Sequence, residues 1–477
     1  MTALRRSRPA PTPAPRPLLR PFPDLVVPTN TQLPLGIFQA CEETLRDNWA
    51  EGTYTAPSLR RSSNADNPLE GFGTEVRSKS KYPWRWLWDS PKHIEVYLAL
   101  GQDAHARTEL QSLFQSQHTD GFIPAHNAKL LGLFTNHIIQ PPMLGSAGLQ
   151  VHAVDGSLPP GTYQGLKAFH EWIAKKCDPV DGLYSIRNGQ ESGDDTSPVF
   201  DGALWGSKKG GFAERAAYQA SRAVYDVYSS WAPAALPRPS IAVKPVMFNA
   251  LYARDLRAMA RLSRALARTA TGEQKTAFLA DAALFDARYA KVRSSMRAKM
   301  RAADPHTPEL GSDFLFWSLD RKGTPIQVRT VELFQAFAAG LLEPAEAVKL
   351  VDYLKDPRSG FWTRFPVPST SIHEPAFDAN DYWRGPVWVD QNKLIVEGLL
   401  DYAHEYGLQA FYGVAQEIFE RSKEMMGVNL PGPMALNEGY NTFTGTAVRQ
   451  GQFSWSSEII CLDQLLRHYE AQHPERF

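Results

Sequence analysis

Residues 411–419 read Phe-Tyr-Gly-Val-Ala-Gln-Glu-Ile-Phe, and their apolar side chains are spaced as on one face of an α-helix. The apolar residues at positions i, i+3, i+4, i+7 and i+8 are Phe411, Val414, Ala415, Ile418 and Phe419. A helix with this pattern buries its apolar face against neighbouring elements. Gly427 follows as a typical stop signal. The stretch therefore predicts an amphipathic helix that is part of a larger helical fold.

The same spacing recurs in three more segments, 256–266, 278–292 and 459–469, whereas alternating strand patterns are scarce. Residues 242–248 are the best strand candidate. We therefore predict an all-α fold. Long loops are predicted near residues 118–165, 190–245, 300–330, 356–390 and 428–453. Long loops are uncommon unless they carry function, and these hold nearly all motifs rich in tryptophan, aspartate and proline. The chemistry is therefore expected at one rim of a helical scaffold.

The charge of the chain is balanced, with 51 basic and 51 acidic residues and a pI near 7.2 over 477 residues. A nucleic-acid-binding protein carries a basic surface, so nucleic acid is not an expected partner. A neutral small molecule, or one with a single small charge, fits the composition better. The sequence has no apolar run of about 18 residues and predicts no membrane span. No feature of the sequence sets an oligomeric state.

Residues 1–27 are rich in proline and arginine, which predicts an extended, flexible segment ahead of one main domain over residues 28–477. The segment lacks the apolar core of a signal peptide, so a cytoplasmic location is expected. Cys41, Cys177 and Cys461 are widely separated and odd in number. They predict small buried side chains rather than disulfides or metal ligands.

Two clusters combine tryptophan with charged residues. Residues 82–90 hold three tryptophans in five positions followed by Asp89. Indole faces stack on sugar rings and a carboxylate accepts hydroxyl hydrogens; the alternative is a buried aromatic wedge with Asp89 capping the next helix. Residues 381–388 add two more tryptophans and Arg384. Its guanidinium suits a carboxylate or vicinal hydroxyls, and the alternative is that it pairs with Asp381 or another structural acid.

Acidic side chains gather in two further loops, 191–198 and 438–441. Cleaving a glycosidic bond needs one carboxyl group as proton donor and a second carboxyl group on the opposite face. The first loop offers Glu191, Asp194 and Asp195, and the second offers Glu438. Acidic loops also serve as helix caps or solvated turns, and spacing alone does not rank Asp194 against Asp195.

Seven motifs follow one another in a characteristic order. They are Trp86-Leu87-Trp88-Asp89-Ser90, Asp120-Gly121-Phe122-Ile123-Pro124, Gln140-Pro141-Pro142, Ser192-Gly193-Asp194-Asp195-Thr196-Ser197-Pro198, Tyr382-Trp383-Arg384-Gly385-Pro386-Val387-Trp388, Glu438-Gly439-Tyr440-Asn441 with Thr444-Gly445, and Phe453-Ser454-Trp455. In this order they resemble glycoside hydrolase family 63, which includes processing α-glucosidase I and the mannosylglycerate and glucosylglycerate hydrolases. The chain looks most similar to the mannosylglycerate and glucosylglycerate branch, because no large β-sandwich domain precedes the helices.

This resemblance implies an (α/α)6 barrel that hydrolyses a small α-mannosyl or α-glucosyl compound with inversion. Asp195 matches the family's general acid, and Glu438 matches its general base. Inversion requires the two carboxyl groups to lie about 6.5–9.5 Å apart, which leaves room for the attacking water. Two carboxyl groups and water complete this chemistry, so neither a metal nor an organic cofactor is expected.

The same resemblance supplies a set of expected substrate-binding residues. They are Tyr82, Trp86, Trp88, Asp89, Gln140, Tyr382, Trp383, Arg384, Gly385, Trp388, Tyr440 and Trp455. Trp86, Trp88 and Asp89 would grip the sugar whose bond is cleaved. The loop around Trp383 would cover the group that leaves.

The chain departs from the family pattern at three places. Asp194 stands where a bulky apolar residue is usual, and either raises the pKa of the acid or points to solvent. Residues 200–243 are longer than in compact members, and Glu458 stands in a stretch that is usually apolar. Two alternatives therefore stay open: an α-glucosidase for a neutral di- or oligosaccharide, and a sugar-binding protein without activity. A trehalase is disfavoured, because its Pro-Gly-Gly-Arg-Phe motif is absent.

Overall fold

The computed structural model describes residues 30–50, 58–59, 85–126, 129–130, 134–231, 236–310, 313–431 and 435–474. The predicted flexible segment 1–27 and Tyr82 lie outside these residues. Helices dominate the described part. Its strands form only two-stranded antiparallel pairs: β1(Trp49–Ala50) with β2(Ser58–Leu59), β3(Lys129–Leu130) with β4(Phe134–Thr135), β5(Ser318–Leu319) with β6(Pro325–Ile326), and β7(Asn437–Tyr440) with β8(Ala447–Gly451).

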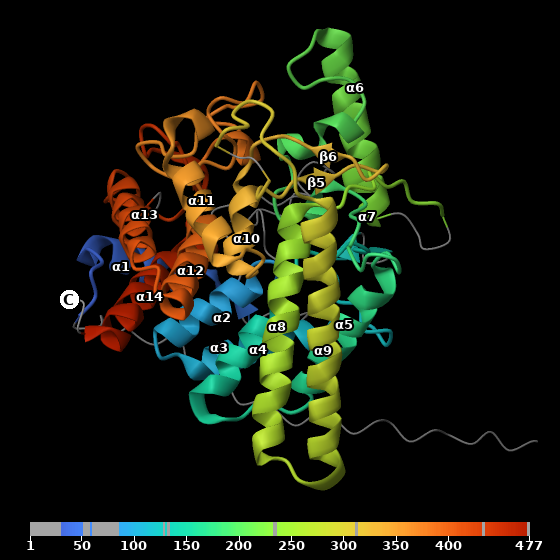
Figure 1. Ribbon diagram of the computed structural model, residues 1–477, viewed down its shortest axis with the longest axis vertical. Coiled ribbons are helices and arrows are strands. Elements are labelled where there is room, and N and C mark those ends of the chain that lie inside the picture. The colour runs from blue at the N-terminus through green and yellow to red at the C-terminus, as the bar shows by residue number, and fades with distance from the viewer. Residues whose placement is uncertain are drawn as a thin grey trace, which may run out of the picture.

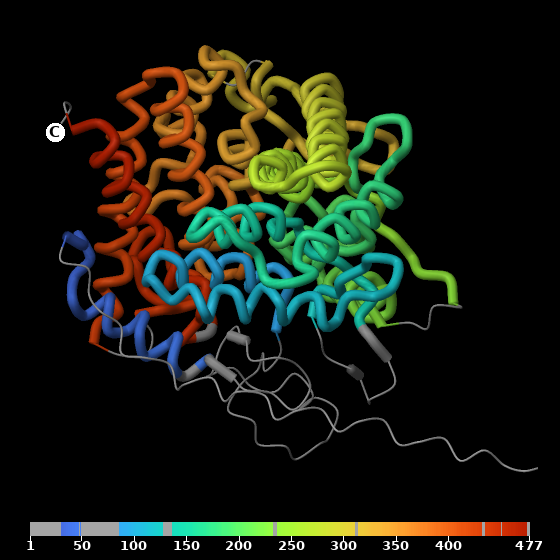
Figure 2. Tube along the Cα trace, turned by 90° about the horizontal axis from the view of Figure 1, so that it is seen from below, coloured from blue at the N-terminus to red at the C-terminus, as the bar shows by residue number. Residues whose placement is uncertain are grey.

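Among the described residues, six helices form a closed inner ring (Figure 2). They are α2(Ser90–Ala99), α4(Leu144–Asp155), α8(Val246–Thr269), α10(Gln335–Ala338), α12(Val389–Tyr406) and α14(Ile459–Gln472). Each of these helices contacts the next one in this order, and α14 contacts α2, which closes the ring.

A second layer of helices packs on the outside of the ring. It consists of α1(Leu35–Asn48), α3(Asp103–Phe114), α5(Thr162–Lys176), α9(Gly272–Lys299), α11(Pro344–Lys355) and α13(Ala410–Gly427). Most outer helices follow an inner one along the chain and pack against it, as the long pair α8 and α9 shows in Figure 1. This arrangement confirms the predicted all-α, (α/α)6 barrel. The helices predicted at 411–419, 256–266, 278–292 and 459–469 are α13, α8, α9 and α14.

Two of the predicted loops contain helices instead. Helix α4 lies within residues 118–165, and α6(Phe212–Arg222), the π-helix η4(Ala223–Tyr228) and α7(Ser229–Trp231) lie within 190–245. Helix α4 was missed because it is apolar nearly all round, so it carries no amphipathic period. Helix α6 extends away from the ring (Figure 1).

The strand predicted over residues 242–248 is wrong. Val243 and Lys244 form only single bridges, to Ile186 and Leu319, and α8 begins at Val246. Pro245 keeps an extended backbone and stands at the N-cap position. The first turn of α8 is fully buried, and a short buried apolar run does not distinguish a helix from a strand by its pattern.

The order of the inner helices brings the sequence motifs to one end of the barrel. Asp89, Pro245, Trp388 and Glu458 stand directly before α2, α8, α12 and α14. Helix N-termini expose unpaired backbone N–H groups and a partial positive charge. This end is therefore suited to carboxylates and polar ligands, as predicted for the rim.

Two further predictions concern the cysteines and membrane-spanning helices. The three cysteines are buried and free, as expected for small apolar side chains. In the part of the chain that the structure describes, helices with the length and apolar character of a membrane crossing are absent.

Candidate active site

The acidic loop is held in a tight, glycine-dependent conformation between η2(Gly189–Glu191) and η3(Pro198–Ala203). Gly193 has φ +92°, and a Cβ atom there would lie 3.2 Å from Trp88 and from Pro141. Only glycine adopts this conformation at low cost. The tight turn presses the loop onto the tryptophan motif and directs adjacent side chains apart. Asp194 is buried, 1% exposed, whereas Asp195 stays partly accessible.

Glu191, the third carboxyl group of this loop, has a structural role. Its oxygens accept hydrogen bonds from the backbone N–H groups of Arg187, at 2.6 Å, and Ile139, at 3.4 Å. Burial raises the pKa of Glu191, and Arg187 acts in the opposite direction. Since Glu191 ties two backbone segments together, it is not available to a substrate. The alternative that Asp194 points to solvent is also wrong, because its side chain is buried.

Glu438 lies in β7 and is 1% exposed. The hydroxyl group of Tyr382 donates a hydrogen bond to its Oε1 atom at 3.1 Å. Tyr382 has φ +24°, and the guanidinium of Arg449 lies 4.8 Å from its ring centroid. Backbone strain of this kind persists only where the surroundings enforce it, and it concentrates at functional sites.

Indoles from three motifs pack together as an aromatic wall. The rings of Trp383 and Trp388 lie parallel, with centroids 3.9 Å apart and an interplanar angle of 2°. Trp455 meets Trp388 edge-on at 5.6 Å. Lys92 Nζ lies 3.7 Å from the ring centroid of Trp88 and 4.2 Å from that of Trp455. These contacts bring tryptophans from three motifs, more than 360 positions apart in sequence, to one place.

Buried polar side chains lie next to this aromatic wall. Lys92 pairs with Asp390 at 2.6 Å, and both side chains are almost completely buried. Gln140 Oε1 accepts a hydrogen bond from the backbone N–H of Trp88 at 3.0 Å. Asp89 is buried at the N-cap position of α2, but its side chain makes no capping hydrogen bond. The capping alternative for Asp89 is therefore not supported.

The segment 382–388 connects the two acidic loops. The backbone N–H of Trp383 donates to Thr196 Oγ1 at 3.4 Å, directly beside Asp195. Tyr382, the preceding residue, donates to Glu438. One loop therefore contacts both Glu438 and the residue next to Asp195. Trp86, in contrast, packs against His126, with ring centroids 4.5 Å apart.

Three expected substrate-binding residues serve the architecture of this loop. Arg384 is 1% exposed and forms a bidentate pair with Asp201, with Nη1 2.9 Å from Oδ2. This is the alternative in which Arg384 pairs with a structural acid: the acid is Asp201, and Arg384 Nε also lies 4.0 Å from Asp381 Oδ2. Position 385 requires glycine, because a Cβ atom there would lie only 2.4 Å from the carbonyl oxygen of Asp378. The hydroxyl of Tyr440 donates to the carbonyl oxygen of Ala435 at 2.6 Å, so its polar end is already bound.

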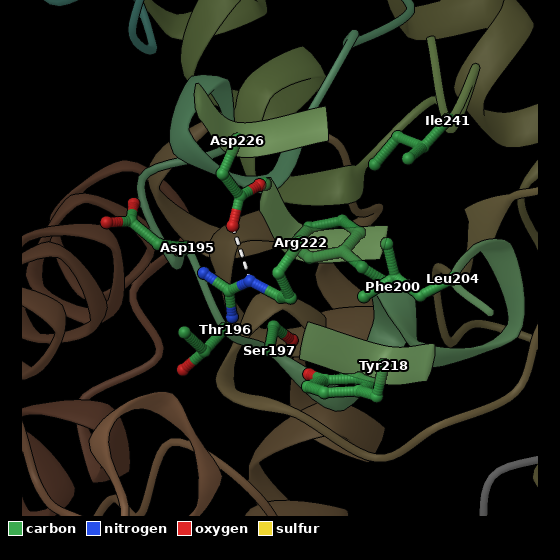
Figure 3. Close-up of a pocket in the computed structure, with 10 residues that line it drawn as sticks. Asp195, Thr196, Ser197, Phe200, Leu204, Tyr218, Arg222, Asp226 and Ile241 are labelled. Atoms are coloured by element: carbon green, nitrogen blue, oxygen red, sulfur yellow. Dashed lines mark hydrogen bonds and ion pairs between the residues drawn. The ribbon is translucent and has the colours of Figure 1, made fainter. Parts of the chain in front are cut away.

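One residue near the acid was missed from the sequence. Arg222 of α6 lies between Asp226 and the segment that contains Asp195 (Figure 3), and it forms an ion pair with Asp226. Burial disfavours its charge, but Asp226, Tyr218 and Asp195 outweigh that effect and raise the pKa of the guanidinium. The cavity here has a volume of about 10 Å³, room for roughly one water molecule, so it does not hold a sugar. A helical arginine in an unusual insertion carries no sequence signal.

The described residues contain no group of three or more histidine, cysteine, aspartate or glutamate side chains suited to hold a metal ion. What the site offers is carboxyl groups close to an aromatic wall, at one end of an (α/α)6 barrel. Such a combination is typical of enzymes that cleave glycosidic bonds.

The comparisons with known proteins agree with this class. A family model for the mannosylglycerate hydrolase MGH1-like glycoside hydrolase domain matches residues 82–456. A mannosylglycerate hydrolase of Rubrobacter radiotolerans is 25% identical over 437 residues, 81% of this chain and 91% of the relative. Its counterpart from Thermus thermophilus is 26% identical, over 80% of this chain and 95% of the relative.

A solved structure gives the same fold. A family 63 mannosylglycerate hydrolase from Thermus thermophilus, in complex with Tris and D-glycerate, superposes with a TM-score of 0.65 at 21% identity. The match covers 90% of this chain and 99% of that one. The chain therefore belongs to the mannosylglycerate hydrolase MGH1-like family of glycoside hydrolases, and it is a glycosidase.

Proposed function

We propose that this protein is an inverting glycoside hydrolase in which Asp195 is the general acid and Glu438 the general base. Asp195 donates its proton to the glycosidic oxygen as the bond to the anomeric carbon breaks. Glu438 takes a proton from water, whose oxygen attacks the anomeric carbon from the opposite face. The products are the free sugar with inverted anomeric configuration and the released alcohol. The catalytic unit is assigned to residues 28–477.

The placement of the two carboxyl groups around segment 382–388 is the observation that supports these roles most strongly. Asp195 is the accessible acid of its loop, while Asp194 and Glu191 are buried and bound to other groups. Tyr382 fixes one oxygen of Glu438. The wall of Trp88, Trp383, Trp388 and Trp455 includes two residues of this segment, and we assign the sugar ring to a site beside it.

For the substrate we propose a small α-mannosyl or α-glucosyl compound such as mannosylglycerate or glucosylglycerate. Several relatives are mannosylglycerate hydrolases, and one solved neighbour holds D-glycerate. Trp86, Trp88, Asp89 and Gln140 are assigned to the sugar, and Tyr382 to the leaving group.

One observation favours a second candidate, an α-glucosidase for a neutral di- or oligosaccharide. A glycerate carboxylate needs a converging cation or tyrosine and amide donors, and three cations of the rim are already paired with carboxyl groups. Arg384 is paired with Asp201, and both Lys208 and Arg449 are paired with Asp381. If these ion pairs persist when the substrate binds, a neutral leaving group fits the rim better than glycerate does.

The deciding experiment measures sugar release from mannosylglycerate, glucosylglycerate, kojibiose and trehalose by the wild type and by Asp195→Asn and Glu438→Gln. General acid–base catalysis contributes about 10²–10⁴-fold, so each variant should lose about that factor in kcat while binding is kept. Asp286→Asn is the control, because Asp286 forms an exposed pair with Arg264 far along α8 and α9.

Turnover of the two glycerates alone supports the first candidate, and turnover of kojibiose alone supports the second. Binding of a sugar without turnover by the wild type would show a sugar-binding protein. If Asp195→Asn keeps full activity, the assignment of the acid is wrong.

A further inference from the structure

A buried pair of carboxyl groups lies directly behind the loop of the assigned acid. Asp194 and Glu332 are 1% and 2% exposed, and their carboxyl groups face each other within interaction range. Among the described residues, Asp194 Oδ1 and Glu332 Oε1 are buried without a hydrogen-bond donor, which leaves both oxygens open to a shared proton. Glu332 belongs to the 3-10 helix η5(Val331–Phe334), which leads into α10 of the inner ring. Asp194 therefore links the acid loop to the barrel wall. Two carboxyl groups that meet form a hydrogen bond only when one of them carries a proton.

The surroundings show which carboxyl group is the acceptor. Glu332 Oε2 accepts a hydrogen bond from Ser318 Oγ at 2.7 Å. The backbone N–H groups of Val246 and Met247, at the N-terminus of α8, also favour the charged form of Glu332, and Val246 N–H donates to Ser318 Oγ at 2.9 Å. Helix N-termini stabilise negative charge. Glu332 is thus set up as the carboxylate, and Asp194 as the group that donates the proton.

All other groups that face the pair are neutral. Asp194 is approached by the hydroxyl groups of Ser192 and Ser197, and Glu332 by Ser318 and the start of α8. Among the described residues, no lysine, arginine or histidine forms an ion pair with either carboxyl group. Burial, together with the charge of Glu332, raises the pKa of Asp194 well above its usual range. Burial likewise raises the pKa of Glu332.

We propose that Asp194 and Glu332 share one proton, and that this shared proton holds the loop in the position that places Asp195 at the glycosidic bond. Asp194 is then a positioning residue and not a catalytic one. Loss of the proton leaves two adjacent buried carboxylates, whose repulsion separates the loop from the wall. This inference rests on the proposed function, because the position of the loop matters for catalysis only if Asp195 is the general acid.

The linkage between this proton and stability has a definite sign. Both groups have raised pKa values in the folded state. Their contribution to stability is therefore fully present below the unfolded-state pKa of about 4 and is lost as the pH rises towards the folded-state values. In Asp194→Asn the amide N–H replaces the shared proton. That variant should lose stability less steeply between pH 5 and pH 9 than the wild type does.

The first test is infrared difference spectroscopy at neutral pH in the Asp195→Asn background, which removes any signal from the assigned acid. The C=O stretch of one protonated carboxyl group should disappear on Asp194→Asn, because Asp194 carries the proton. On Glu332→Gln the band should persist but shift, because Asp194 stays buried and changes only its hydrogen-bond partner. A band that survives Asp194→Asn, or one that does not shift on Glu332→Gln, overturns the proposal.

The second test compares kcat and KM of three single variants on the substrate that the wild type turns over. Asp194→Asn should keep kcat within about threefold, since it retains the hydrogen bond. Asp194→Leu should lower kcat about 10²-fold with little change in KM, because the acid is misplaced. Wild-type-like kcat in Asp194→Leu would overturn the proposal. Inactive Asp194→Asn together with active Asp195→Asn would instead overturn the assignment of the acid.

Discussion

At the scale of single residues, the ion pair between Arg384 and Asp201 decides what the loop at 382–388 does. The Arg384 side chain is 2% exposed and that of Asp201 36% exposed. Tyr218 also donates a hydrogen bond to Asp201 Oδ1 at 3.3 Å. Because guanidinium and carboxylate meet as a fork, the loop is attached to the insertion that carries α6. Arg384 is thereby a structural element of the rim.

We expect Asp201→Ala to lower the free energy of unfolding by about 2 kcal/mol, because it leaves a buried guanidinium without its partner. Urea denaturation measures this change. The control Asp286→Ala breaks an exposed pair and should cost less than about 1 kcal/mol. A variant as stable as the wild type but altered in its preference for charged over neutral substrates would contradict this role and return Arg384 to the substrate.

At the scale of elements, glycines set how closely the inner helices approach. A Cβ atom on Gly398 of α12 would lie 2.6 Å from the backbone of Phe337 and Ala338 in α10. Gly413 of α13 is exposed, and a Cβ atom there would contact nothing within 4 Å.

The two glycines therefore predict opposite effects of the same change. Gly413→Ala should stabilise by up to about 1 kcal/mol, because alanine is the better helix former. Gly398→Ala should destabilise by about 1–3 kcal/mol, because α10 and α12 would have to move apart. Thermal unfolding of both variants measures the difference. Equal shifts of the melting temperature would show that α10 and α12 are not packed this closely.

Buried charges between α2, α8 and α12 explain the unusual Glu458. Lys393 pairs with Glu95 and, at 2.8 Å, with Glu397, while Arg254 also pairs with Glu397. The two positive charges of Lys393 and Arg254 balance the two negative charges of Glu95 and Glu397. Glu458 adds a third carboxyl group beside them, and burial, with Glu95 nearby, raises its pKa well above the usual range. Glu458 is therefore expected to be neutral in the folded protein.

Replacing a neutral carboxylic acid by its amide should cost little. We expect Glu458→Gln to change the unfolding free energy at pH 7 by less than about 1 kcal/mol. Lys393→Met should cost about 3–5 kcal/mol, because it leaves carboxylates unpaired. Since a raised pKa means stability lost as pH rises above about 4, Glu458→Gln should also flatten that decline. Denaturation midpoints measured over a pH series test both the stability at pH 7 and its decline with pH. A large loss of stability in Glu458→Gln at pH 7 would show that Glu458 is charged in the folded protein.

At the scale of the whole molecule, the two ends of the described chain close the barrel together. The backbone N–H of Gln32 and the hydroxyl of Thr31 each donate to Asp463 of α14, both at 2.8 Å. Helix α1 contacts α13 beside them. Asp463 is buried and thus joins the first and last described segments.

If the ring is one cooperative unit, Asp463→Ala should lower the midpoint of a single unfolding transition, with a loss of about 1–3 kcal/mol. Calorimetry together with circular dichroism measures this. The matched variant Asp463→Asn keeps one acceptor and should lose less. A separate early transition in Asp463→Ala would show that the ring opens at this seam before the rest unfolds.

Sequence reasoning recovered the fold because helical periodicity is local and the ordered motifs are specific. It singled out Asp195, Glu438 and the tryptophans of three motifs, and the structure connects the segments that carry them. It did not identify Asp201 as the partner of Arg384, because such a pair spans 183 positions. The contact between Asp194 and Glu332 was invisible for the same reason. The start of α8 was misread, since a buried apolar run has no period of its own.

The most direct test of the proposed mechanism is the configuration of the first-formed sugar. Proton NMR during early turnover of an α-mannosyl or α-glucosyl substrate by the wild type distinguishes the two anomers before they equilibrate. The arrangement of Asp195 and Glu438 predicts that the β-anomer forms first, because water attacks the face opposite the leaving group. Initial formation of the α-anomer would contradict an inverting site and the roles assigned to these two carboxyl groups.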